Sequence, residues 1–69
     1  MIRFTLNGEA SQTPLGTSVR ALLMSLDIDP ATGGIAVAVN ASVVPRSHWP
    51  ETFIEVNDEV EIVRATAGG

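Results

Sequence analysis

The chain has 69 residues, which is room for one domain. It contains no cysteine, so disulfides, thiol nucleophiles and thiolate metal sites are excluded. Its single histidine, His48, cannot form a metal site without several carboxylates beside it. Eight acidic residues against four basic ones give a net charge of −4, which argues against a nucleic-acid partner. No apolar run approaches the ~20 residues of a membrane span, and no secretion signal opens the sequence, so we expect a cytoplasmic protein without a membrane partner.

The first half of the chain predicts a β-hairpin followed by a helix. Residues 1–6 alternate between apolar and polar side chains, as in a half-buried strand. The Asn-Gly pair at 7–8 favours a tight turn because both residues tolerate a positive φ, and residues 9–13 are the expected return strand. Thr17 or Ser18 caps a helix whose apolar residues recur at i, i+3, i+4 and i+7. The members of this stripe are Val19, Leu22, Leu23 and Leu26.

Next along the chain come a helix break and two further strands. Residues 27–30 end the helix with a proline. Residues 35–39 are a continuous apolar run, which we expect to be a strand covered on both faces or nearly so. A turn at 40–42 and a short edge strand at 43–44, limited by Pro45, should follow.

The last third of the chain predicts an irregular segment, a final strand and a tail. Residues 47–53 have no regular pattern, and Trp49 and Phe53 are the expected anchors to the core. Residues 59–64 alternate again, as a strand does. Residues 65–69 have nothing to bury and are expected to be flexible.

Together these elements predict an α+β fold. The simplest packing is one mixed sheet of about five strands with the single helix lying across one face. Residues 1–64 would form this domain and residues 65–69 a flexible C-terminal Gly-Gly tail.

Four places along nearly the whole chain carry a family resemblance. They are Gly16-Thr17-Ser18-Val19 with Leu22-Leu23; Ala36-Val37-Ala38-Val39-Asn40 with Val43-Val44-Pro45-Arg46; Trp49; and the turn Asn57-Asp58 with the terminal Ala67-Gly68-Gly69. On these residues the chain resembles the ThiS family, the sulfur carriers of thiamin thiazole synthesis. The Ala-Val-Asn, Val-Pro-Arg and Trp combination is the most specific part. In the last turn the family often has Asp-Gly-Asp, whereas this chain has Val-Asn-Asp at 56–58.

The resemblance implies a ubiquitin-like β-grasp fold and a role as a co-substrate, with no catalytic residue, no metal and no bound cofactor. It implies that the carboxylate of Gly69 is adenylated by a ubiquitin-activating-type enzyme that consumes ATP. A cysteine desulfurase or another persulfide donor then supplies sulfur, and the resulting thiocarboxylate donates it to thiazole synthase. The free carrier is expected to be a monomer.

Residues near the end of the chain suit this chemistry. Gly68 and Gly69 lack a Cβ and Ala67 is small, so the tail could thread into a partner's active site. Five extended residues span at most ~17 Å. Val63 lies on the outward face of the last predicted strand and could belong to an apolar docking patch leading into the tail. Arg46 could contact a partner or pair with a surface acid.

Three alternatives remain open from the sequence. A carrier of the same fold could serve molybdopterin synthesis or another sulfur-containing product. The chain could be a ubiquitin-like protein modifier attached through Gly69. It could also be an interaction domain with no reactive end.

Overall fold

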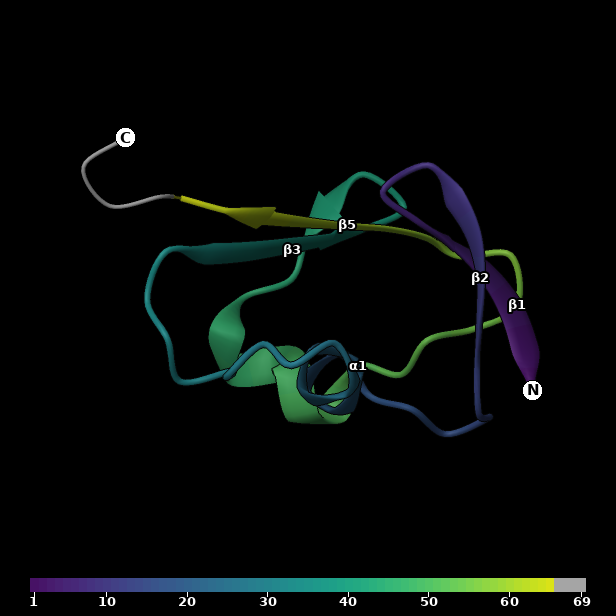
Figure 1. The fold of residues 1–69 in the computed structure, drawn as a ribbon, viewed down its shortest axis with the longest axis horizontal. Helices are drawn as coiled ribbons and strands as arrows, with labels where there is room; N and C mark the ends of the chain where they lie inside the picture. The colour runs from purple at the N-terminus through teal and green to yellow at the C-terminus, as the bar shows by residue number, and fades with distance from the viewer. Residues whose placement is uncertain (66–69) are drawn as a thin grey trace.

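The computed structural model describes residues 1–65, and residues 66–69 lie outside this description. Within residues 1–65, five strands form one mixed sheet in the order β2-β1-β5-β3-β4. They are β1 (Ile2–Leu6), β2 (Glu9–Thr13), β3 (Ile35–Val39), β4 (Ser42–Val43) and β5 (Glu59–Arg64). The helix α1 (Val19–Ser25) and the 3-10 helix η1 (Arg46–Glu51) lie on one side of this sheet (Figure 1). The predicted α+β arrangement of a mixed sheet and one α-helix is therefore confirmed.

The N-terminal hairpin forms as the Asn-Gly pair predicts. Asn7 and Gly8 have φ values of 49° and 83°, the left-handed conformation that a tight hairpin turn requires at both central positions. Leu6 consequently pairs with Glu9, and the antiparallel register continues to Ile2 opposite Thr13. This register turns Ile2 and Phe4 of β1 towards the core.

Helix α1 is short, and both of its ends are capped. The Ser18 side chain accepts a hydrogen bond from the Ala21 N–H at 3.0 Å, which confirms one of the two predicted caps. At the other end Asp27 has φ 60°, and the Ile28 N–H donates to the Leu23 carbonyl at 2.9 Å, as in a Schellman motif. The prediction that Leu26 belongs to the buried stripe is wrong, because Leu26 is the exposed C-terminal cap. Ile28 is buried beyond the cap instead.

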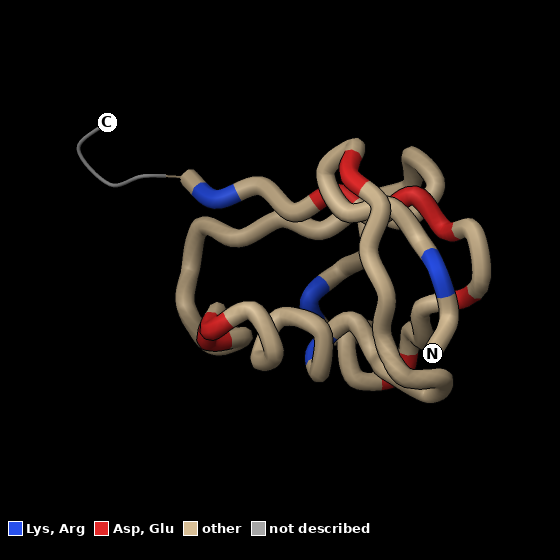
Figure 2. Tube along the Cα trace, turned by 45° about the vertical axis from the view of Figure 1, so that its right-hand side comes forward, with Lys and Arg blue, Asp and Glu red and all other residues tan. Residues whose placement is uncertain are grey.

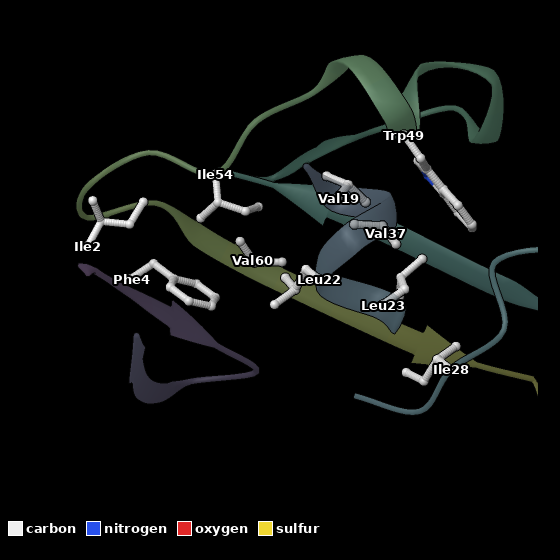
Figure 3. Close-up of a cluster of buried hydrophobic side chains, with 10 residues drawn as sticks. All are labelled: Ile2, Phe4, Val19, Leu22, Leu23, Ile28, Val37, Trp49, Ile54 and Val60. Carbon is white, nitrogen blue, oxygen red and sulfur yellow. The ribbon is translucent and has the colours of Figure 1, made fainter. Parts of the chain in front are cut away.

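The core lies between the helix and the facing side of the sheet (Figure 3). Its members are Ile2, Phe4, Val19, Leu22, Leu23, Ile28, Val37, Trp49, Ile54 and Val60. Trp49 closes one end of this core, and its indole N–H donates to the Val44 carbonyl at 2.9 Å. Trp49 is therefore an anchor, as predicted, whereas the same prediction for Phe53 is wrong because 54% of Phe53 is exposed.

Two further expectations for the second half of the chain are wrong. Strand β3 is covered on one face only, since Val37 is buried while Ala36 is exposed on the opposite side. The segment 47–53, expected to be irregular, contains most of η1, a short 3-10 helix that includes Pro50. Within residues 1–65 no helix is long and apolar enough to cross a membrane.

Candidate functional site

Strand β5 carries the chain to its C-terminal residues from the middle of the sheet. On one side it runs parallel to β1, with Leu6 opposite Val60. On the other side it is antiparallel to β3, from Val60 opposite Val39 to Arg64 opposite Ile35. Strand β5 is thus paired on both sides where it begins and with β3 up to its end, which supports the strand that leads to the last part of the chain (Figure 1).

The side chain of Asn7 continues the support of β5 where β1 ends. Its Oδ1 accepts a hydrogen bond from the Ile62 N–H at 2.8 Å, and its Nδ2 donates to the Ile62 carbonyl at 3.3 Å. One amide side chain thus replaces a strand neighbour for both backbone groups of Ile62. The turn-forming role of Asn7 is visible in the sequence, but this second role depends on a contact between residues 55 positions apart.

A buried carboxylate organises the turn that starts β5. Asp58 is 7% exposed, and its carboxylate accepts hydrogen bonds from the Asn40 Nδ2 at 3.0 Å and from the Glu55 N–H at 2.8 Å. The Asn40 Oδ1 in turn accepts from the Glu59 N–H at 2.9 Å. The turn after β3 and the turn before β5 are therefore joined by side chains, which fixes where β5 begins. The neighbouring glutamates in the sequence do not indicate that Asp58 is buried.

The face of the sheet opposite the helix carries an apolar strip near the end of β5. Val63 is 60% exposed and pairs across the strands with Ala36. Ala38 continues the strip on β3, and its partner Val43 on β4 is 74% exposed. We call Ala36, Ala38, Val43 and Val63 the apolar strip. The predicted outward orientation of Val63 is confirmed.

Acidic residues border this strip on its N-terminal side along β5. Glu61 pairs with Ala38 and Glu59 lies two residues earlier, so both carboxylates share the face of Val63. In Figure 2 most acidic segments lie on the side of the molecule that carries the N-terminus. An apolar surface with an acidic border suits a partner that offers an apolar patch beside basic side chains.

Arg46 makes contacts within its own chain. Its guanidinium donates to the carbonyls of Pro30 and Thr32, the latter at 2.8 Å, and lies 4.5 Å from the centre of the Trp49 ring. These contacts tie the loop before β3 to the start of η1. A partner contact by Arg46 stays a prediction, and the expected pairing with a surface acid gives way to these two carbonyls. His48 lies exposed in η1.

The predicted reactive residues Gly69, Gly68 and Ala67 lie outside the described residues. Ala65, the last described residue, donates its N–H to the Gly34 carbonyl at 2.7 Å. Among residues 1–65 no group of three or more histidine and carboxylate side chains could hold a metal ion. The described part of the molecule thus offers a supported strand, an exposed apolar strip and a fixed starting point for the last residues.

Comparisons with known proteins agree with this arrangement. Residues 4–69 match the model of the ThiS family. The chain is 35% identical over 63 residues to the sulfur carrier protein ThiS of Escherichia coli strain K12, covering 91% of this chain and 92% of that protein. It is also 32% identical over 68 residues to a thiazole synthase of Magnetococcus marinus. That match covers 99% of this chain but only 20% of the thiazole synthase.

Solved structures support the same assignment. The crystal structure of a ThiS thiamine biosynthesis protein from Geobacter metallireducens has a TM-score of 0.77 and 27% identity, covering 99% of this chain and all of that one. The solution structure of a thiamine biosynthesis protein from the same organism has a TM-score of 0.78, with 99% of this chain and 88% of that one covered. The ubiquitin-like β-grasp fold implied by the sequence resemblance is thereby confirmed. With its fold, its family match and its relatives in agreement, this chain belongs to the ThiS family.

Proposed function

We propose that this chain is a sulfur carrier for the thiazole part of thiamin and that the carboxylate of Gly69 is its working group. The observation that carries the proposal is the match to the sulfur carrier ThiS of Escherichia coli, which extends over nearly the full length of both chains. The thiazole synthase match adds support for the thiazole branch. A segment similar to this chain occurs within a thiazole synthase, which favours thiazole synthase as the acceptor of the sulfur.

The chemistry needs a carrier that delivers its end and partners that catalyse. A carboxylate is a poor electrophile, so an adenylating enzyme first joins it to AMP and releases pyrophosphate from ATP. The outer sulfur of a cysteine persulfide then displaces AMP and forms an acyl disulfide with Gly69. A thiol reductant cleaves the S–S bond of this disulfide and is itself oxidised to a disulfide, which leaves a thiocarboxylate on Gly69. Thiazole synthase consumes that sulfur and regenerates the carboxylate. In this scheme the chain is a co-substrate that binds no cofactor itself and acts in the cytoplasm.

In this proposal two parts of the chain have different roles. Residues 1–64 would be the domain that partners recognise, and residues 65–69 the tail that enters their active sites. Glycine has no Cβ, so Gly68 and Gly69 can pass through a narrow channel and adopt the backbone angles that the active site requires. The small side chain of Ala67 keeps the approach narrow.

The apolar strip is the surface we assign to partner docking. Val63 is two residues from Ala65, so a partner that covers Val63 also lies next to the start of the tail. Burial of an exposed valine is worth roughly 1.5–3 kcal/mol, and the carboxylates of Glu59 and Glu61 can add attraction to a basic rim. For Arg46, a partner would have to contact the guanidinium in addition to the carbonyls of the loop before β3 that it already binds.

Growth of a bacterial strain that lacks its own ThiS and requires thiazole tests the proposal. Expression of the wild-type chain should remove the requirement, and the same chain without Gly69 should not. A strain that lacks its molybdopterin carrier serves as the matched control and should not be rescued. Rescue of the second strain alone would transfer the function to the molybdopterin branch, and protein adducts through Gly69 without any rescue would favour a modifier.

A further inference from the structure

Ala65 continues the sheet one step beyond the end of β5. The last residue of β5, Arg64, pairs with Ile35, the first residue of β3. The Ala65 N–H then donates to the carbonyl of Gly34, the residue just before β3, at 2.7 Å. The ladder between β3 and β5 is therefore extended by one hydrogen bond, and Ala65 is held against the β3 side of the sheet.

Gly34 is suited to this contact in two independent ways. Its φ of +80° lies in the left-handed region, which favours glycine. A Cβ on Gly34 would also lie 3.3 Å from the Ala65 carbonyl oxygen, which is tighter than an ordinary contact, so Ala65 would have to shift by a few tenths of an ångström to make room for a side chain. Gly8 and Gly16 share the positive φ, but a Cβ there would meet nothing within 4 Å. Among the glycines of the described residues, only Gly34 combines the positive φ with a close contact.

We propose that Gly34 is a positioning residue that fixes Ala65 as the root of the reactive tail. This inference rests on the proposed function, because it concerns how the Gly69 carboxylate is delivered. With Ala65 held on the sheet, only residues 66–69 must be ordered in a partner's active site, and these span at most roughly 14 Å. The anchor thus sets the distance between the apolar strip, where the partner docks, and the carboxylate that it must reach.

Loss of the anchor has a calculable consequence. Ala65 would join the segment that has to be ordered on binding, and ordering one further backbone residue weakens binding roughly 5- to 30-fold. This cost applies equally to the bound ground state and to the transition state, so KM for the carrier should rise while kcat stays nearly constant. A mutation that only destabilised the fold would leave KM of the folded protein unchanged.

The test compares Gly34→Ala with Gly16→Ala. Both substitutions place an alanine at a positive φ, but only the first adds a contact with Ala65. Amide hydrogen exchange measured by NMR on the free protein should show faster exchange at Ala65 in Gly34→Ala only. Steady-state ATP–pyrophosphate exchange by the adenylating enzyme should then show the roughly 5- to 30-fold rise in KM for Gly34→Ala, and a wild-type KM for Gly16→Ala.

A second variant keeps the test decisive if Gly34→Ala folds poorly. Asparagine tolerates a positive φ better than alanine. The Gly34→Asn variant therefore places the same Cβ against Ala65 with less backbone strain. It should show the same loss of protection and the same rise in KM. Unchanged protection of Ala65 in both Gly34 variants, or a wild-type KM in both, would overturn the positioning role. If the wild-type chain is not adenylated, the proposed function is overturned, and so is the role of Gly34 in delivering the tail. Amide exchange at Ala65 would then test only the hydrogen bond from the Ala65 N–H to the Gly34 carbonyl.

Discussion

Replacement of Asp58 by alanine should destabilise the fold more than any other removal of a carboxylate from β5 or its preceding turn. The Asp58 side chain is 7% exposed and receives hydrogen bonds from the Asn40 side chain and the Glu55 backbone. The alanine variant leaves both donors without this acceptor. Glu61 is an exposed carboxylate on β5, so Glu61→Ala is the matched control.

The expected size follows from the two hydrogen bonds. A hydrogen bond to a charged group contributes about 1.5–3 kcal/mol, and an unsatisfied buried donor adds to the loss. Asn40 and Glu55 are both exposed residues, so water can reach the freed donors and reduce that second part. We therefore expect Asp58→Ala to lower the free energy of unfolding by about 2–3 kcal/mol. Glu61→Ala should change it by less than about 0.5 kcal/mol.

Urea denaturation followed by tryptophan fluorescence measures this difference. Trp49 is the only tryptophan and is buried, so its emission reports loss of the core. With a slope of about 1 kcal/mol per M, the midpoint of Asp58→Ala should fall by roughly 2–3 M relative to wild type. A midpoint within about 0.5 M of the Glu61→Ala value, near the precision of such fits, would show that the buried carboxylate does not join the two turns.

Three further changes test other parts of the structure. Trp49→Phe removes the indole hydrogen bond to Val44 and leaves a small cavity, so unfolding monitored by circular dichroism should show a loss of about 1–3 kcal/mol; wild-type stability would contradict the anchoring role. Val63→Asp should weaken binding to the adenylating enzyme about tenfold or more in titration calorimetry. The control Gln12→Asp, on the distant edge strand β2, should bind with wild-type affinity. Equal affinities of the two variants would show that the apolar strip is not the docking surface. Deletion of Gly69 should leave the urea midpoint unchanged, because every strand found in residues 1–65 ends at or before Arg64. A clearly lower midpoint would show that the last residue also stabilises the fold.

The predictable parts of the fold are those that local chemistry determines. The Asn-Gly turn needs only two residues that tolerate a positive φ, and the cap of α1 needs only the hydroxyl of Ser18 and a nearby N–H. Alternation along β5 correctly places Val60 inside and Val63 outside. These features require no knowledge of distant segments, so the sequence is sufficient for them.

The errors arise where distant contacts decide the outcome. Leu26 continues the helical spacing, but the left-handed Asp27 ends the helix and Ile28 takes the place in the core. The apolar run of β3 suggests burial on both faces, yet one short helix can cover only one face of the sheet. Phe53 is large and aromatic, but its neighbour Ile54 points into the core and leaves Phe53 on the surface.

The candidate site is predictable in its chemistry and less so in its support. The family resemblance indicates Gly69, and the alternation of residues 59–64 indicates that Val63 faces outward. The clamp by Asn7, the buried Asp58 and the close approach of Gly34 to Ala65 each join residues separated by many positions, and nothing in the local sequence marks them. Arg46 illustrates the same limit, since its carbonyl partners belong to a loop that the sequence pattern does not place beside it.

Sulfur transfer to Gly69 is tested most directly by the intact mass of the chain after incubation with ATP, a ubiquitin-activating-type adenylating enzyme, a cysteine desulfurase and cysteine. We expect a mass gain equal to the exchange of one oxygen for sulfur, located in the fragment that ends in Gly69 and absent when Gly69 is deleted. An unchanged mass, with the same enzymes active on the ThiS protein of Escherichia coli, would contradict the claim that this chain carries sulfur on its Gly69 carboxylate.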